Sequence, residues 1–230
     1  MIVGIHQPNF LPWIGYFNKI KNSDIFVFLN DVQFEQGKTF TSRTKILCGG
    51  VEIWLTIPIK KKSDLKDIKD TFVDDNFIWK KKHLKTIQLN YCKAPYFEEI
   101  FSMIEKNYAK PGQHITDYNI PLIKDFCEYM NIKTEFVCSH NIAQAQGLNG
   151  WHKILSIIMD LKADVYLSGS GAGSKRYVNA EDLIKNNIAL EWQNYTPVKY
   201  NQINCKGDFI PNLSIIDLLF NYGKDAANFI

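Results

Sequence analysis

Three polar side chains follow the first apolar segment of the chain and are suited to chemistry. Residues 1–5 form a short apolar run, and His6, Gln7 and Asn9 come directly after it. A histidine can move a proton near neutral pH, and amide side chains can orient a substrate through hydrogen bonds. We interpret this segment as a candidate catalytic and binding site. A structural turn with a satisfied histidine is the simpler alternative.

The elements around this segment predict where its side chains lie. A stretch with Trp13 and Ile20 at helical spacing comes next, and Pro12 suits its first turn. A second apolar run, residues 25–29, follows at once. Strand, helix and strand in this order predict a parallel pair, whose carboxyl ends meet at the edge where ligands bind. There the rings of Trp13 and Tyr16 can stack on a base or a sugar.

A glycine-rich segment follows a later apolar run. Residues 168–174 read SGSGAGS. Glycines after a strand let the backbone approach a phosphate, and a following helix offers its N–H groups to the anion. The segment matches neither the Walker A motif nor G-x-G-x-x-G. Ser168, Gly169, Gly171 and Lys175 are therefore candidate ligand contacts, with a flexible surface loop as the alternative.

Alternating strands and helices predict the fold class. The expected strands are residues 2–5, 25–29, 134–138, 164–167 and 188–192. Helical segments separate them, which is typical of a Rossmann-like α/β fold with a parallel sheet of about five strands. Polar residues end these strands and should meet at one edge of the sheet. They are His6, Asp31, His140, Ser168 and Gln193.

Two insertions are expected within a single α/β domain that spans residues 1–230. Residues 44–59, with Gly49-Gly50 as the turn signal, predict a β-hairpin. Residues 75–131 predict a small helical subdomain. The charged residues 60–74 predict an exposed loop. The expected helices after the hairpin are residues 75–90, 96–108, 115–131, 151–162, 180–186 and 213–222, the last with Asn212 or Ser214 as its cap.

Other charged side chains complete the set of candidates. Asp31 and His83 are, with His6, the candidate proton carriers. His83 shares a predicted helix face with Trp79, so simple packing is its alternative role. Arginine and lysine side chains can bind phosphate or carboxylate groups. The remaining candidate substrate contacts are Gln33, Arg43, Lys45 and Lys82.

Composition argues against several classes of protein. A net charge of +3 over 230 residues is too small to indicate a nucleic-acid-binding protein. The five cysteines have no CxxC spacing, which fits buried thiols in a reducing compartment and no metal site. No apolar run approaches the roughly 20 residues of a membrane span, and the first residues do not form a secretory signal. We expect a cytoplasmic protein with no bound cofactor and no membrane partner.

Six motifs along the chain carry a resemblance to one family. They are IHQPNFLPWIGYFNKI from Ile5, DVQFEQGKTFTSRTKI from Asp31, WLTIPI from Trp54, WKKKH from Trp79, YLSGSGA from Tyr166 and FIPNLSIIDLLFNYG from Phe209. This set resembles the WbqC-like protein family over almost the entire chain. One departure is Ser42 before Arg43, where the family usually has Asn-Arg.

The resemblance implies a bacterial protein of O-antigen or other surface-polysaccharide biosynthesis. It implies transfer of glycine, or another amino acid, onto the amino group of a nucleotide-linked sugar. The donor would arrive activated, as a charged tRNA, an aminoacyl-adenylate made from ATP, or a thioester. Charged tRNA is thus a second expected partner, and a homodimer stays open.

Two other classes of protein remain alternatives. The strand, loop and helix carrying His6 are similar in layout to those of nucleotidyl transferases and class I synthetases, which favours an ATP-dependent nucleotidyl transferase or ligase. The second histidine of their H-x-G-H motif is absent here, and Tyr16 stands in its place. The other alternative is a non-catalytic protein that binds a nucleotide-sugar.

Overall fold

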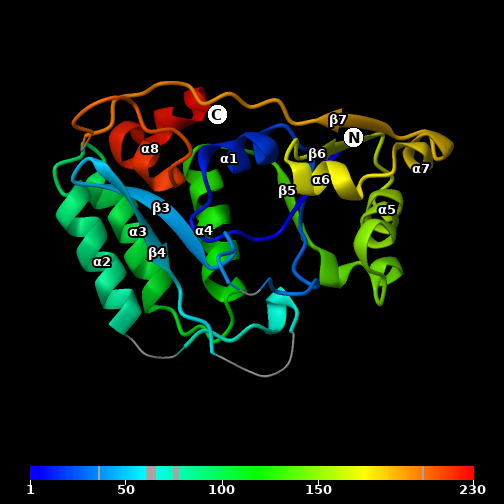
Figure 1. The fold of residues 1–230 in the computed structure, drawn as a ribbon, viewed down its shortest axis with the longest axis horizontal. Helices are drawn as coiled ribbons and strands as arrows, with labels where there is room; N and C mark the ends of the chain where they lie inside the picture. Colours follow the sequence, from blue (N-terminus) through cyan, green and yellow to red (C-terminus); the bar gives the residue numbers. More distant parts are fainter. Residues whose placement is uncertain (36, 61–65, 75–77, 204) are drawn as a thin grey trace. The chain divides into compact units, whose positions relative to one another are not determined.

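The structure is a computed structural model, and it describes every residue of the chain except 36, 61–65, 75–77 and 204. The chain forms two compact units (Figure 1). Unit 1 comprises Met1–Gln7, Asn18–Val32 and Lys133–Thr196. Unit 2 comprises Pro8–Phe17, Gln33–Ile132 and Pro197–Ile230.

A five-stranded parallel sheet forms the centre of unit 1. Its strands are β1 (Ile2–His6), β2 (Ile25–Phe28), β5 (Glu135–Cys138), β6 (Val165–Ser168) and β7 (Ala189–Trp192). Their order across the sheet is β5-β2-β1-β6-β7, and each neighbouring pair is parallel. The α/β class and the parallel sheet predicted from the sequence are confirmed, and each strand agrees with its predicted range to within one residue at either end.

The winding of this sheet reverses direction once. From β1 the order runs to β2 and then β5 on one side, and later to β6 and β7 on the other side. The reversal therefore lies between β1 and β6. In open α/β sheets, ligands bind outside the carboxyl ends of the strands at such a switch point.

Unit 1 also contains helices, two of which pack on the sheet. The helices are α5 (Gly150–Asp160), α6 (Ala172–Tyr177), α7 (Ala180–Lys185) and the second half of α1 (Ile14–Lys21), with short 3-10 turns η2 (Ser139–Asn141) and η3 (Ala143–Ala145). Ile157 of α5 and Leu183 of α7 share a buried cluster with Val3 and Tyr166. These two helices thus cover the face that carries the odd-numbered side chains of β1, because side chains alternate along a strand.

The opposite face of β1 receives the end of α1. A Cβ atom at Gly4 would lie 2.3 Å from Oγ of Ser23, which follows the helix. Glycine at this position lets the turn after α1 come close to the strand. The same approach brings Lys19 of α1 near the end of β1.

Unit 2 combines a hairpin with helices. Its elements are the first half of α1, β3 (Arg43–Cys48), β4 (Val51–Thr56), η1 (Ile68–Asp70), α2 (Ile78–Tyr91), α3 (Phe97–Ala109), α4 (Thr116–Tyr129), α8 (Ile215–Tyr222) and η4 (Gly223–Phe229). The predicted hairpin is confirmed: β3 and β4 are antiparallel. Gly49 and Gly50 have φ angles of +59° and +93°, the left-handed backbone that a tight hairpin turn requires.

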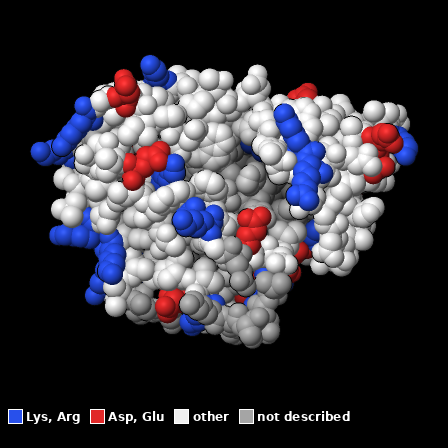
Figure 2. All heavy atoms as spheres, viewed as in Figure 1, with Lys and Arg blue, Asp and Glu red and all other residues white. Residues whose placement is uncertain are grey.

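The predicted helices after the hairpin are also present, and Ser214 caps α8 by accepting a hydrogen bond from the Ile216 N–H. The first three residues of the helix predicted over 75–90 lie outside the described residues. None of the helices in the described part of the chain is long and apolar enough to cross a membrane. On the face drawn in Figure 2, Lys and Arg side chains are scattered among acidic and uncharged ones.

Four local predictions were wrong. Pro12 stands two residues before α1, where its carbonyl accepts a hydrogen bond from the Ile215 N–H (2.7 Å). Within 66–74, the described part of the expected exposed loop, the side chains of Ile68 and Val73 are buried. The last three residues of 168–174 form the start of α6 rather than a loop.

The thiols were the fourth. Only Cys127 is buried, whereas Cys92 is exposed and Cys48, Cys138 and Cys205 are partly exposed. Burial of Ile68 and Val73, and exposure of most thiols, depend on contacts with residues distant in the chain, which a local pattern does not report.

Candidate functional site

The carboxyl ends of the unit 1 strands bring together residues that are far apart in the sequence. His6 at the end of β1 lies beside Phe28 of β2, and Leu167 of β6 lies beside Gly4 of β1. The N–H of Gln193, after β7, donates to the carbonyl of Ser168 at 2.8 Å. The five polar residues that the sequence predicted at this edge each end or follow a strand of the same sheet. They are His6, Asp31, His140, Ser168 and Gln193.

His6 is neutral at pH 7 and has a defined basic nitrogen. Its Nδ1 lies 3.1 Å from the Gln7 carbonyl oxygen. A carbonyl only accepts, so Nδ1 carries the hydrogen and Nε2 is the basic atom of the neutral ring. Burial, and then the charge of Lys19, lower the pKa of His6 to about 4, although the residue is not fully covered. The neutral ring of His6 therefore has Nε2 as its hydrogen-bond acceptor.

Lys19 is a functional candidate that the sequence did not reveal. Its side chain reaches from α1 to the end of β1, where Nζ donates to the Ile5 carbonyl at 2.7 Å. The residue is 2% exposed, and burial lowers its pKa to about 7. Among the described residues, no carboxylate lies within 4.0 Å of Nζ. In the sequence, Lys19 cannot be distinguished from a lysine on the exposed face of a helix, so no sequence signal marks it.

Asp31 is held in place by buried partners. Its Oδ2 pairs with Nζ of Lys153 at 2.8 Å, and the two side chains are 4% and 3% exposed. The Ser139 hydroxyl donates to Oδ1 of Asp31. Lys153 also donates to the Ala145 carbonyl at 3.0 Å. Asp31 thus joins the end of β2 to α5 and to the end of β5.

A second polar contact joins the same two strand ends. The backbone N–H of Asn30 donates to Oγ of Ser139 at 3.1 Å. The side-chain nitrogen Nδ2 of Asn30 lies 2.9 Å from Nδ1 of His140. His140 itself is exposed. The expected residues Asp31 and His140 therefore belong to one network, to which the structure adds Asn30, Ser139 and the buried Lys153.

The serine and glycine residues after β6 lie on the other side of the switch point. Ser168 is 0% exposed, and its Oγ makes no hydrogen bond of normal geometry with the described residues. Burial raises the pKa of Tyr166, and the neighbouring Ser168 hydroxyl partly offsets that rise. Gly169 is partly exposed and Gly171 is exposed. Nζ of the exposed Lys175 lies 5.8 Å from the centre of the Trp192 ring, so this lysine leans toward β7.

Four predicted substrate contacts belong to the surface of unit 2. The Arg43 guanidinium lies 3.8 Å from the centre of the Trp54 ring on the hairpin. Lys45 on the same strand forms an ion pair with Glu52 at 2.6 Å. Gln33 is exposed and forms an isolated bridge with residue 67, and Lys82 is exposed on α2.

The aromatic residues before and within α1 are also in unit 2. Tyr16 is 2% exposed and Asn9 is 7% exposed. Burial raises the pKa of Tyr16 well above its usual range. Trp13 is partly exposed and covers Gly15, where a Cβ atom would lie 2.1 Å from the indole ring. Of the two rings, only Trp13 has an exposed surface to offer a ligand.

His83 lies in an aromatic cluster of unit 2. It is 5% exposed, Nδ1 is 3.2 Å from the Tyr108 hydroxyl, and the ring meets Trp79 edge-on at 5.2 Å. Burial lowers its pKa to about 4. This geometry agrees with the alternative role given to His83, which is packing against Trp79.

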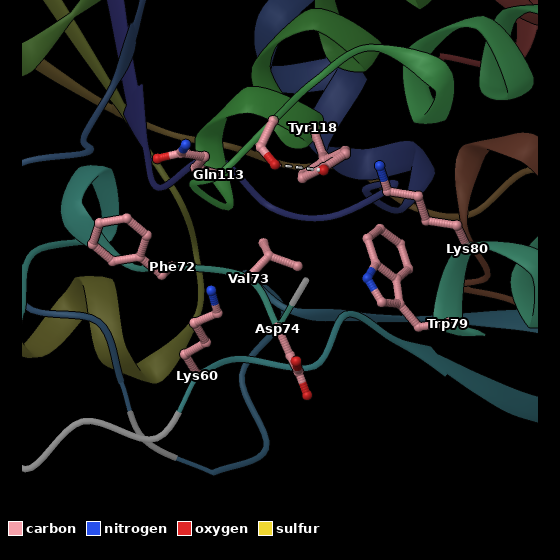
Figure 3. Close-up of a pocket in the computed structure, with 9 residues that line it drawn as sticks. Lys60, Phe72, Val73, Asp74, Trp79, Lys80, Gln113 and Tyr118 are labelled. Atoms are coloured by element: carbon pink, nitrogen blue, oxygen red, sulfur yellow. Dashed lines mark hydrogen bonds between the residues drawn. The ribbon is translucent and has the colours of Figure 1, made fainter. Parts of the chain in front are cut away.

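A cavity of about 150 Å³ lies beside this cluster in unit 2 (Figure 3). Its lining residues are Lys60, Phe72, Val73, Asp74, Trp79, Lys80, Gly112, Gln113 and Tyr118. Lys80 donates to the Tyr108 carbonyl at 2.8 Å and lies 4.8 Å from the centre of the Tyr118 ring. In the view of Figure 3 the Asp74 carboxylate points away from the aromatic rings. The lysine side chains and aromatic rings of this cavity are suited to binding a ligand. The candidate proton carrier His6 lies elsewhere, at the carboxyl edge of the sheet.

The comparisons with known proteins agree with the motifs. A model of the WbqC-like protein family matches residues 7–229. The chain is also similar to an uncharacterized protein of Mycobacterium tuberculosis, with 30% identity over 232 residues that cover 99% of this chain and 96% of the relative. No solved structure matches the chain. The resemblance drawn from the motifs is thereby confirmed, and the chain belongs to the WbqC-like protein family.

Proposed function

We propose that this protein is a transferase that attaches an amino acid, with glycine as the first candidate, to the amino group of a nucleotide-linked sugar. The observation that carries the proposal is the switch point between β1 and β6, because open α/β sheets bind nucleotide ligands there. His6, with a basic Nε2, ends one of the two strands, and the buried Ser168 ends the other.

The amino-acid part of the proposal has a different source. It follows from what resemblance to the WbqC-like family implies, and the geometry adds compatible chemistry. The sugar's amine nitrogen attacks the activated carbonyl carbon, an amide bond forms, and the bond to the donor's leaving group breaks. Nε2 of His6 accepts the proton that the amine loses. Backbone N–H groups of Gly169 and Gly171 are the candidate donors to the developing oxyanion.

Asp31 has a different role in this scheme. Its carboxylate already contacts Lys153 and Ser139. We assign it to positioning: it holds the ends of β2 and β5 beside β1. The proton carrier is then His6, and His83 contributes to the packing of unit 2.

The decisive assay combines acceptors with activated donors. The purified protein is incubated with a panel of nucleotide-linked amino sugars and with glycine plus ATP, glycyl-tRNA or a glycyl thioester. Mass spectrometry then looks for a glycyl increment on the sugar nucleotide. A product with one donor and one acceptor is the expected result, and its absence from every combination would contradict the proposal.

Two histidine variants make the assay specific. His6→Ala should abolish most of the turnover, because proton transfer by a positioned base contributes about 10²- to 10⁴-fold. His152→Ala is the matched control, since His152 is an exposed histidine on α5 in the same unit. Full turnover in His6→Ala would remove His6 from the mechanism.

An ATP-dependent ligase is the second candidate. The position of His6 at the end of β1, before α1, favours it, because nucleotidyl transferases share this layout. The same assay separates the two functions. A ligase releases pyrophosphate from ATP when the amino acid is added, whereas a transferase that uses a charged tRNA or a thioester does not.

A further inference from the structure

The two central strands stop pairing before they end. The last paired residues of β1 and β6 are Gly4 and Leu167. The next carbonyl on β1 that points to β2 belongs to His6, which accepts from the Leu29 N–H at 2.9 Å. Carbonyls alternate in direction along a strand, so the Ile5 carbonyl points to the β6 side, at the switch point.

The side chain of Lys19 takes the place of the missing backbone donor to the Ile5 carbonyl. Its Nζ donates to the Ile5 carbonyl at 2.7 Å, in place of an N–H from β6. An ammonium group has three N–H donors. A buried cation is costly unless an anion or several acceptors surround it. Among the described residues no carboxylate lies within 4.0 Å of this nitrogen.

Ser168 is a second buried polar group at the switch point, and its hydroxyl also interacts with the neighbouring Tyr166 side chain, whose pKa it lowers. The serine follows Leu167 on β6, its residue is 0% exposed, and its Oγ makes no hydrogen bond of normal geometry with the described residues. By alternation its side chain lies on the face of Tyr166, whereas Lys19 approaches from the face of Gly4. The two groups therefore flank the same switch point from the two faces of the sheet.

We propose that Lys19 is the anion-binding residue of this site and that its ammonium contacts a phosphate oxygen of a nucleoside diphosphate group, with the Ser168 hydroxyl as a neighbouring donor. This proposal rests on the proposed function for one point: that the full ligand is a sugar nucleotide. The diphosphate chemistry is shared by a sugar nucleotide, by ATP-derived nucleotides and by free pyrophosphate.

A phosphate at this position would also change proton binding. Burial lowers the pKa of Lys19 to about 7, and burial together with the Lys19 charge lowers that of His6 to about 4. A bound anion favours the charged form of a neighbouring cation and so raises both pKa values. Near pH 8, binding should therefore be accompanied by proton uptake, mainly by Lys19.

Titration calorimetry tests the proposal with three ligands. UDP, ADP and inorganic pyrophosphate distinguish the uridine nucleotide, the adenine nucleotide and the bare diphosphate. Lys19→Met removes the charge, and Lys19→Gln removes the charge while keeping an N–H donor for Ile5. Both variants should bind the preferred ligand at least about tenfold more weakly, because a hydrogen bond to a charged group is worth roughly 1.5–3 kcal/mol. Lys21→Met, at an exposed lysine of the same helix, should bind as the wild type does.

Proton uptake provides a readout that a purely structural role would not change. Titrations near pH 8 in buffers with different ionisation enthalpies give the number of protons taken up on binding. The wild type should take up a fraction of a proton, and Lys19→Met and Lys19→Gln should lose most of that uptake. Thermal denaturation of each variant confirms that it is folded.

The outcomes separate this inference from the proposed function. Weaker binding and lost proton uptake in both Lys19 variants support the inference even if no glycyl product ever forms. Unchanged affinity in a folded Lys19 variant overturns it, as does a wild-type protein that binds none of the three ligands at millimolar concentration. A glycyl product together with unchanged binding in the variants would support the proposed function and reject the role of Lys19.

Discussion

Asp31 and Lys153 form a buried ion pair at the carboxyl edge of the sheet, with 2.8 Å between Oδ2 and Nζ. The pair joins the segment after β2 to α5, and the Ser139 hydroxyl donates to the same carboxylate. Burying two charges costs solvation free energy, which their mutual attraction offsets only while both are present. The pair therefore has a larger effect on stability when one member is removed than when both are.

The first prediction concerns this pair. Asp31→Asn or Lys153→Met alone should lower the free energy of unfolding by about 3–5 kcal/mol, because each leaves an uncompensated buried charge. The double variant Asp31→Asn/Lys153→Met should recover a substantial part of that loss. Urea denaturation of the four proteins gives the coupling free energy.

A control for this prediction lies in the same unit. Lys185 pairs with Asp182 at 3.9 Å, and its side chain is 69% exposed. Lys185→Met should cost less than about 1 kcal/mol, since exposed ion pairs contribute little. Additive losses in the Asp31 and Lys153 cycle would show that the two charges do not act as a pair.

The second prediction concerns the ring of His6. Nitrogen-detected NMR should show a neutral ring at pH 7 with the hydrogen on Nδ1, because Nδ1 lies 3.1 Å from a carbonyl oxygen. Lys19→Met should raise the pKa of His6 from about 4, since it removes a neighbouring positive charge, although burial remains the larger cause. A His6 pKa that stays the same in Lys19→Met would contradict the electrostatic link.

The third prediction is a pH dependence of stability in unit 2. Burial lowers the pKa of His83 from 6.5 to about 4 in the folded state. Between these values the unfolded chain binds a proton that the folded chain does not, so stability falls as the pH falls through this window. The contribution of His83 is on the order of 3 kcal/mol.

A substitution isolates this contribution. His83→Gln should destabilise the protein at pH 7, because it removes the ring that packs on Trp79. It should also lose less further stability than the wild type when the pH falls from about 7 to about 4.5. Urea midpoints at the two pH values measure both effects, and an unchanged pH dependence would mean that folding does not lower the pKa of His83.

The fourth prediction concerns the buried carboxylate of α8. Asp217 is 0% exposed and accepts hydrogen bonds from the Tyr91 hydroxyl (2.8 Å), the Tyr200 hydroxyl (2.7 Å) and the Gln202 amide (3.1 Å). Asp217→Leu leaves these three buried donors without their acceptor. It should lower the free energy of unfolding by at least about 3 kcal/mol.

Two tyrosine variants calibrate this effect. Tyr200→Phe removes one donor to the carboxylate and should cost about 1–2 kcal/mol. Tyr222→Phe removes a hydroxyl that accepts from the exposed Asn201 N–H at 3.1 Å and should cost less. Chemical denaturation measures both, and equal costs would show that the Asp217 network has no special weight.

Much of the sheet was predictable because its strands have a local sequence signal, a short apolar run. Residues 25–29 are continuously apolar, as expected for a strand covered on both faces, and β2 forms there. The Gly49-Gly50 pair predicted a tight turn because few other residues tolerate its backbone angles. The polar residues His6 and Asp31 follow their strands directly, so their place at the carboxyl edge could also be inferred.

Burial and pairing could not be inferred in the same way. Lys19 and Lys82 are both helical lysines, yet one is 2% exposed and the other lies on the surface. Lys153 has no local feature that pairs it with Asp31, which precedes it by more than a hundred positions. The difference arises from which helix face meets the sheet, and this depends on contacts between distant segments.

Local patterns were thus sufficient for the α/β class, the strand ranges and the histidine at the end of β1, because apolar runs and turn residues reflect interactions over a few positions. The folded chain was needed to reveal the order β5-β2-β1-β6-β7, the switch point beside His6 and the buried amine of Lys19. Strand order and the burial of a charge follow from long-range packing, in which each residue's environment is supplied by segments that the local sequence does not specify.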